Sequence, residues 1–217
     1  MKKTMKKTAL LILAVLLWAP PAHAKETVRS FHQRIPIGSA GRIHLDFPVG
    51  EVQVTGGDNR QVDLDVKITC NELTDRCESA AKRLRVVFNR ADGQLEIRVA
   101  DWPPMGATKG LNVEAVLRVP RNLPLRADLS VGKLTIDGIA ADVTADHGVG
   151  EVHGTLPKEA IGSANIDAGI GEASLVAAGR RYSSEGLIVR AIHWDKGPGR
   201  GRVKVDCGVG EIHVTLA

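Results

Sequence analysis

Aromatic residues are scarce in this 217-residue chain, which has three Trp, three Phe and one Tyr. A core with so few rings is built mainly from Val, Ile, Leu and Ala, which suits thin, closely stacked β layers. Long hydrophobic runs are also lacking. The apolar run from Ala9 to Trp18 is about half the ~20 residues that a membrane-spanning helix needs. The sequence therefore predicts a β-rich fold without a membrane span.

An excess of basic residues is absent once residues 1–24 are set aside. Four lysines precede the apolar run and Ala22-His23-Ala24 follows it, which is the pattern of a secretory signal peptide. Without these four, 25 of the 29 basic residues remain and balance 25 acidic ones, so the basic surface of a nucleic-acid binder is not expected. We expect export of the mature chain to the periplasm, the cell surface or the medium.

Cysteine is limited to three residues. Cys70 and Cys77 flank a short turn, and in an exported chain a disulfide between them is the expected state. A zinc pair is the alternative, although no second pair matches it. Cys207 stands in an apolar context and is expected to be a buried free thiol, with intermolecular pairing as the minor alternative.

One phrase recurs along the chain. Val203–Leu216 consists of an alternating strand, an Asp, an aliphatic-Gly pair, a charged residue and a second alternating strand. Its central glycine is repeated as Gly50, Gly132, Gly150, Gly171 and Gly210. From Gly132 the intervals are 18, 21 and 39 residues, and a period of ~20 residues predicts a solenoid of stacked coils. The longest interval is close to two periods, so one coil, roughly Ser183–Pro198, is expected to have lost the phrase.

Each phrase changes its facing at the glycine. Ala145, His147 and Val149 share one parity, whereas Val152 has the other. Because a phase change of one residue moves every side chain to the opposite face, the strand must bend or bulge at Gly150-Glu151.

The rest of the chain fits around these repeats. Residues 25–40 are assigned to an N-terminal extension and 41–217 to a single domain, with an irregular part at 41–120 and regular repeats at 121–217. In the irregular part, alternation and turn residues predict five strands. Helix-forming residues with an acid at their start predict one helix. The strands are expected at 43–54, 62–68, 85–89, 94–99 and 112–119, and the helix at 75–84.

These features together carry a family resemblance. A signal peptide, alternating strands with a short helix, and Asp-x-Gly-Val-Gly-Glu-Val at Asp146–Val152 resemble the bacterial putative-adhesin family, over about residues 40–217. The resemblance implies an all-β fold, a right-handed β-solenoid or β-helix-like stack of short strands, in the cell envelope. It implies an exported β-strand-repeat domain of unknown function, which we interpret as a non-catalytic binding or scaffolding module whose partner is an envelope protein or a glycan.

A row of aspartates is the first candidate site. In adjacent coils, Asp128, Asp146 and Asp167 would stack about 5 Å apart, close enough to share a calcium ion. The favoured interpretation is that each carboxylate caps its own corner by accepting backbone N–H groups. The calcium interpretation makes a calcium-stabilised glycan-binding module the alternative function, whereas capping predicts no metal and no cofactor.

Catalysis and metal binding by the other repeated side chains are not expected. Glu51, Glu151, Glu172 and Glu211 recur at one phrase position, where a polysaccharide-active enzyme would need a single differentiated pair. No nucleophile elbow, phosphate loop or His-Glu-x-x-His motif occurs, so we predict no catalytic residue and no enzyme. His153 and His213 share a phrase position, but chain order places them about three coils or ~14 Å apart, too far to bind one ion.

The segment that lacks the phrase is the candidate partner surface. Interleaved arginines and aromatic residues are typical of binding surfaces, and the alternative is a solvated irregular coil. The candidate residues are Arg180, Arg181, Tyr182, Trp194 and Arg200.

Overall fold

The computed structural model describes residues 26–103, 110–186 and 191–217, so the expected signal peptide lies outside the described residues. The described part is all-β with one helix, as predicted. The elements are β1 (Glu26–Pro36), β2 (Arg42–Gly57), β3 (Gln61–Cys70), α1 (Asp75–Arg83), β4 (Arg85–Ala91), β5 (Gln94–Ala100), β6 (Leu111–Pro120), β7 (Leu125–Asp137), β8 (Val143–Leu156), β9 (Ile161–Ala177), β10 (Arg180–Gly186), β11 (Ile192–Trp194) and β12 (Gly201–Leu216).

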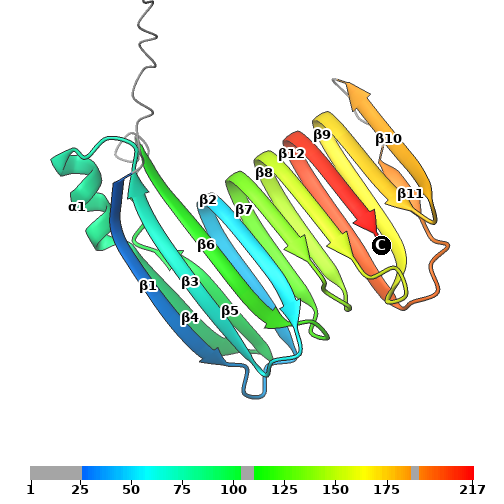
Figure 1. The fold of residues 1–217 in the computed structure, drawn as a ribbon, viewed down its shortest axis with the longest axis horizontal. Helices are drawn as coiled ribbons and strands as arrows, with labels where there is room; N and C mark the ends of the chain where they lie inside the picture. The colour runs from blue at the N-terminus through cyan, green and yellow to red at the C-terminus, as the bar shows by residue number, and fades with distance from the viewer. Residues whose placement is uncertain (1–25, 104–109, 187–190) are drawn as a thin grey trace, which may run out of the picture.

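The strands form one mixed sheet of twelve strands (Figure 1). Its main path runs β1-β3-β6-β2-β7-β8-β12-β9-β10, while β11 pairs with β9 and the β4–β5 hairpin joins β2 through β5. Antiparallel pairs occupy the β1 end, and the phrase-bearing strands pair in parallel. The sheet is open, with β1 and β10 at the ends of its main path. It is therefore not a closed β-helix.

The irregular N-terminal part follows the predicted elements closely. Helix α1 begins after Thr74, whose side chain accepts a hydrogen bond from the Cys77 backbone N at 3.3 Å, as N-cap residues do. The Cys70–Cys77 disulfide is present, which confirms that prediction. Cys207 is a buried free cysteine, as expected.

Strand β1 lies within residues 25–40, which we had assigned to an N-terminal extension. It pairs antiparallel with β3, and Ile35 is fully buried. Most of its other side chains are polar and partly or fully exposed, which suits an edge strand but hides its periodicity from sequence inspection.

The strands that carry the phrase fold over on themselves. Figure 1 shows β7, β8, β12 and β9 curving over at one end, so that each strand contributes to two layers. In β12, the buried residues before the bend are Val203, Val205 and Cys207, and those after it are Ile212, Val214 and Leu216. The change of parity is therefore the point at which each strand returns across the core.

The bend exposes one residue that alternation had placed with the buried set. His147 is buried, but Val149, of the same parity, is 48% exposed. Gly148 is exposed as well, so the alternation already fails at that residue. The turn therefore begins two residues before the predicted corner at Gly150-Glu151.

A row of glycines makes this bend possible. Gly50, Gly132, Gly150, Gly210 and Gly171 are register partners on successive strands, with φ between 131° and 145°. A Cβ atom at Gly150 would lie 1.9 Å from the Gly132 carbonyl oxygen. Only glycine accepts both this backbone conformation and this approach.

Strand β12 is inserted out of chain order. It pairs in parallel with β8 on one side and with β9 on the other, so it separates two strands that are consecutive among the phrase-bearing strands. In the described part of Ser183–Pro198, which leaves out residues 187–190, the expected extra coil is not found. Instead, β10 and β11 pair antiparallel with the two halves of β9, and the chain then returns to the gap beside β8. The 39-residue interval between Gly171 and Gly210 therefore contains β10 and β11, which pair with β9 before β12 begins.

Within the described ranges, none of the structure's helices has the length and apolar character to cross a membrane.

Gly150→Ala should destabilise the fold much more than Gly179→Ala. Both glycines have positive φ, but a Cβ at Gly179 would meet nothing within 4 Å. We expect Gly179→Ala to cost about 1 kcal/mol from backbone strain, and Gly150→Ala to cost at least about 3 kcal/mol because neighbouring strands must also separate. Urea unfolding measures both values, and equal costs would contradict the close-approach explanation.

Candidate functional site

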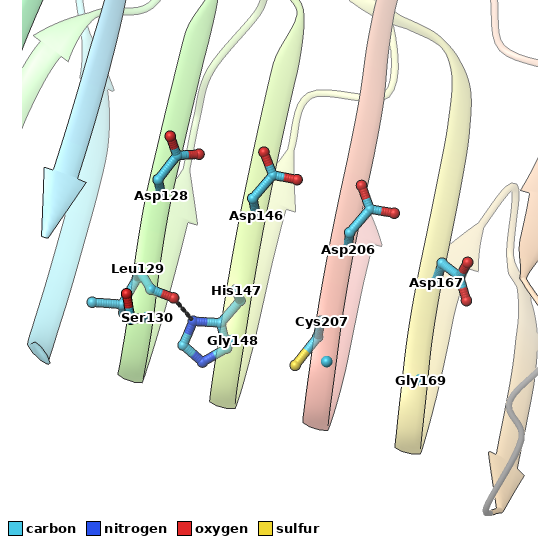
Figure 2. A pocket seen from close by; sticks show the side chains of 11 residues that line it. Asp128, Leu129, Ser130, Asp146, His147, Gly148, Asp167, Gly169, Asp206 and Cys207 are labelled. Atoms are coloured by element: carbon cyan, nitrogen blue, oxygen red, sulfur yellow. Dashed lines mark hydrogen bonds between the residues drawn. The ribbon is translucent and has the colours of Figure 1, made fainter. Parts of the chain in front are cut away.

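The aspartates of the phrase form a row across five strands. In spatial order they are Asp46, Asp128, Asp146, Asp206 and Asp167, each a register partner of the next. Figure 2 shows the last four side by side, with Asp206 between Asp146 and Asp167. Our expectation that Asp146 and Asp167 lie in adjacent coils was therefore wrong, because β12 separates their strands.

Basic side chains on the same face accompany these carboxylates. Asp128 lies 2.7 Å from His44 Nε2 and 3.1 Å from Arg126 Nε. Arg126 also pairs with Asp146, and Lys204 pairs with Asp206. Among the described residues, Asp128, Asp146 and Asp206 make side-chain ion pairs, and no backbone cap is seen on any aspartate of the row, so the corner-cap interpretation lacks support. The calcium interpretation lacks support too, since no group of three or more His, Cys, Asp or Glu in the described ranges is arranged to hold a metal ion.

Charge repulsion acts along the aspartate row. Partial burial raises the pKa of Asp146 above its ordinary value, Arg126 opposes that shift, and the nearby carboxylates of Asp128 and Asp206 add to it. In the part of the chain that the structure describes, Asp167 has no such counterion, because the residue of β9 that pairs in register with Lys204 is Asn165. A positively charged ligand would find its most favourable position beside the aspartate row.

A shallow groove runs beside the row and crosses four strands. Its volume is about 490 Å³, and Asp128, Asp146, Asp206 and Asp167 line it together with Ser130, Gly148, Gly208 and Gly169. These small residues stand at equivalent phrase positions, and Figure 2 shows Ser130, Gly148 and Gly169 on the same strands as the carboxylates. A Cβ atom at Gly148 would lie 2.3 Å from the Ser130 carbonyl oxygen, so close packing of the strands leaves no room for a side chain at this position of the groove.

An exposed aliphatic row follows the groove at the bend. Val131, Val149, Val209 and Ile170 are register partners on β7, β8, β12 and β9, and each is between 44% and 48% exposed. The row spans about 14 Å at the usual strand spacing. We call these four residues the aliphatic row. Sequence reasoning missed it, although the repeated aliphatic residue before each bend glycine was the available signal.

His147 is the buried polar residue beneath the groove. Its Nδ1 lies 2.9 Å from the Leu129 carbonyl oxygen, drawn in Figure 2, and its Nε2 lies 3.1 Å from the Gly132 carbonyl oxygen. A neutral imidazole has one N–H, so it donates to only one of these acceptors. Burial lowers the pKa of His147 despite the backbone carbonyls, which favour the charged form. His147 therefore belongs to the core.

The glutamate row lies on the other side of the bend. Glu51, Lys133, Glu151, Glu211 and Glu172 are successive register partners. Lys133 pairs with Glu151 at 3.1 Å, and Arg181 pairs with Glu172 at 3.2 Å. The row thus consists of similar, solvent-accessible side chains with separate partners, without the differentiated pair that glycoside hydrolysis requires.

The structure corrects the predicted separation of His153 and His213. The two residues are register partners on β8 and β12, and their ring centroids lie 5.3 Å apart. The prediction of about three coils assumed that chain order equals spatial order. Insertion of β12 beside β8 removes that separation.

The predicted partner surface does not form a single exposed cluster. Trp194 is 6% exposed and belongs to the core, because β11 pairs with the first half of β9. Tyr182 is partly buried against the core on β10, which pairs with the second half of β9. Arg180, Arg181 and Arg200 are exposed.

The fold has a counterpart among solved structures, whereas no protein-family model and no curated protein matches the chain. A putative cell adhesion protein from Clostridium sporogenes aligns over 88% of this chain and 100% of its own, with 17% identity and a TM-score of 0.53. A putative lipid binding protein from Parabacteroides distasonis aligns over 85% and 65%, with 12% identity and a TM-score of 0.36. A putative adhesin from Bacteroides fragilis aligns over 86% and 97%, with 11% identity and a TM-score of 0.25. The Clostridium structure shows a shared fold, which agrees with the resemblance to the bacterial putative-adhesin family.

His147→Leu should reduce the loss of stability at acidic pH. Because the folded protein lowers the pKa of His147, the unfolded chain takes up this proton more readily. The free energy of unfolding therefore falls as pH drops through about 6.5 and continues to fall toward the folded-state pKa. Leu matches Leu129 in the neighbouring strand and cannot titrate. Urea unfolding at pH 8 and pH 5 measures the effect, and an unchanged pH dependence in the variant would contradict it.

Proposed function

We propose that this chain is an exported, non-catalytic binding module of the cell envelope. Its bent strands are, in this proposal, the coils of an open solenoid, and its ligand lies across β7, β8, β12 and β9 beside the bend. The observation that carries the proposal is the aliphatic row, four exposed side chains in register. Contiguous exposed apolar surface of this kind marks interaction sites more often than isolated exposed residues do.

The chemistry of the surface favours a protein partner with both basic and apolar side chains. Carboxylates line the groove next to the aliphatic row, and their mutual repulsion at Asp146 would be relieved by lysine or arginine from a ligand. A neutral or acidic glycan offers no such charge, so a protein segment is the better fit. The fold shared with the putative cell adhesion protein from Clostridium sporogenes is compatible with this role, and the Cys70–Cys77 disulfide is compatible with export.

Crosslinking from the aliphatic row tests the proposal. A photoreactive amino acid in place of Val149 or Val209 should give a discrete protein adduct in the producing cell. Asp146→Lys in the same chain should reduce that adduct about tenfold, because the reversed charge repels a basic partner by roughly 1.4 kcal/mol. Gel shift and mass spectrometry measure the yield and the identity of the adduct.

Val116 provides a matched control, since it is also 48% exposed but lies on β6, outside the row. The same photoreactive residue there should give no such adduct. Equal adducts from Val116, no protein adduct from the row, or a glycan adduct would contradict the proposed surface and partner.

A further inference from the structure

Two imidazoles and two carboxylates meet on the outer face of β8 and β12, after the bend. His153 pairs in register with His213 and Glu151 with Glu211. Glu151 Oε2 lies 3.2 Å from His153 Nε2, and Glu211 Oε2 lies 3.4 Å from His213 Nε2. The imidazole side chains are 37% and 31% exposed, so solvent reaches both rings.

A buried serine on the next strand orients the ring of His213. Ser174 on β9 is 4% exposed, and its Oγ lies 2.7 Å from His213 Nδ1. Ser174 Oγ also lies 3.4 Å from the Ile212 carbonyl oxygen. A hydroxyl can donate to Nδ1 or accept from Nδ1–H, and in either case this short contact holds the ring with Nε2 toward Glu211. Such a hydrogen bond to the second ring nitrogen is the usual way in which a metal-binding histidine is oriented.

Each ring turns its Nε2 atom toward a carboxylate of its own strand. When the ring proton of His213 is on Nδ1, where Ser174 Oγ can accept it, Nε2 offers a lone pair to a cation held beside Glu211. Protonating both imidazoles would place two positive charges on rings only 5.3 Å apart, whereas one divalent ion can be shared by both rings.

Glu211 is the carboxylate available to complete the set. Its neighbour Glu151 pairs with Lys133 and its other neighbour Glu172 pairs with Arg181, while Glu211 contacts His213. Two imidazoles and one carboxylate form a common set of protein ligands for zinc. As the side chains stand, the described residues contain no preformed group of three such ligands, so binding requires exposed side chains to rotate.

We propose that His153, His213 and Glu211 form a surface site for a divalent transition-metal ion of the zinc type. Because the ligands come from β8 and from the inserted strand β12, the bound ion ties these two strands together. The site lies on the far side of the bend from the aspartate row, and it does not depend on the proposed binding function.

Titration of the untagged, purified protein with zinc chloride at pH 7.5 tests the site. We expect one zinc equivalent by calorimetry and, at zinc concentrations about 100-fold above Kd, a rise in Tm of about 5 to 10 °C. Magnesium should have no effect, because imidazole ligands select transition metals. Affinity should fall at acidic pH, because metal binding requires deprotonated ligands.

The variants His153→Gln and His213→Gln should each lower the zinc affinity at least about tenfold, and their metal-free Tm shows whether they are folded. His32→Gln is the matched control, since His32 pairs with Asp65 at 2.8 Å on another part of the surface and should leave binding unchanged. The proposal is overturned if zinc does not bind, if both single variants bind like the parent, or if His32→Gln removes the same equivalent.

Discussion

Contact between the backbones of stacked glycines is the constraint on which the repeat region depends. At Gly132, Gly150, Gly210 and Gly171, a Cβ atom would lie within 2 Å of a carbonyl oxygen of the neighbouring strand. Their positive φ angles turn each strand back across the core, so both halves bury their apolar residues against each other. The same turn directs the aliphatic row outward and leaves four of the aspartates along a groove that is partly lined by glycine. The candidate surface is therefore a consequence of the bend.

Insertion of β12 makes these surface rows continuous. Its register with β8 and β9 matches glycine to glycine and aspartate to aspartate, so Val209 and Asp206 fill places that would otherwise interrupt the rows. The same insertion brings His213 beside His153 and within 2.7 Å of the buried Ser174. One strand thus completes the groove on one side of the bend and the imidazole pair on the other.

Local patterns predicted the local features. Helix propensity located α1, alternation located β3 and β6, and an Asp-Gly turn located the β4–β5 hairpin. Spacing and the exported context predicted the Cys70–Cys77 disulfide. The predictions failed where a property depends on neighbours distant in sequence. Trp194 looked like a surface residue in an irregular segment, but pairing of β11 with β9 buries it. Val149 looked like a core residue, but the bend turns it outward.

The sequence by itself determined the all-β class, the glycine bend, the period of the repeats and the side chains of each row, because these depend on two-residue alternation and on the conformational range of glycine. Tertiary structure alone decided the order in which the strands lie. Several copies of the phrase are similar enough to pair with one another, so alternation defines which face a residue occupies without defining its neighbour. Which strands become neighbours depends on the path of the chain. Strands β10 and β11 pair with β9, and β12 then lies between β8 and β9. It brings His153 and His213 together and places Asp206 between Asp146 and Asp167.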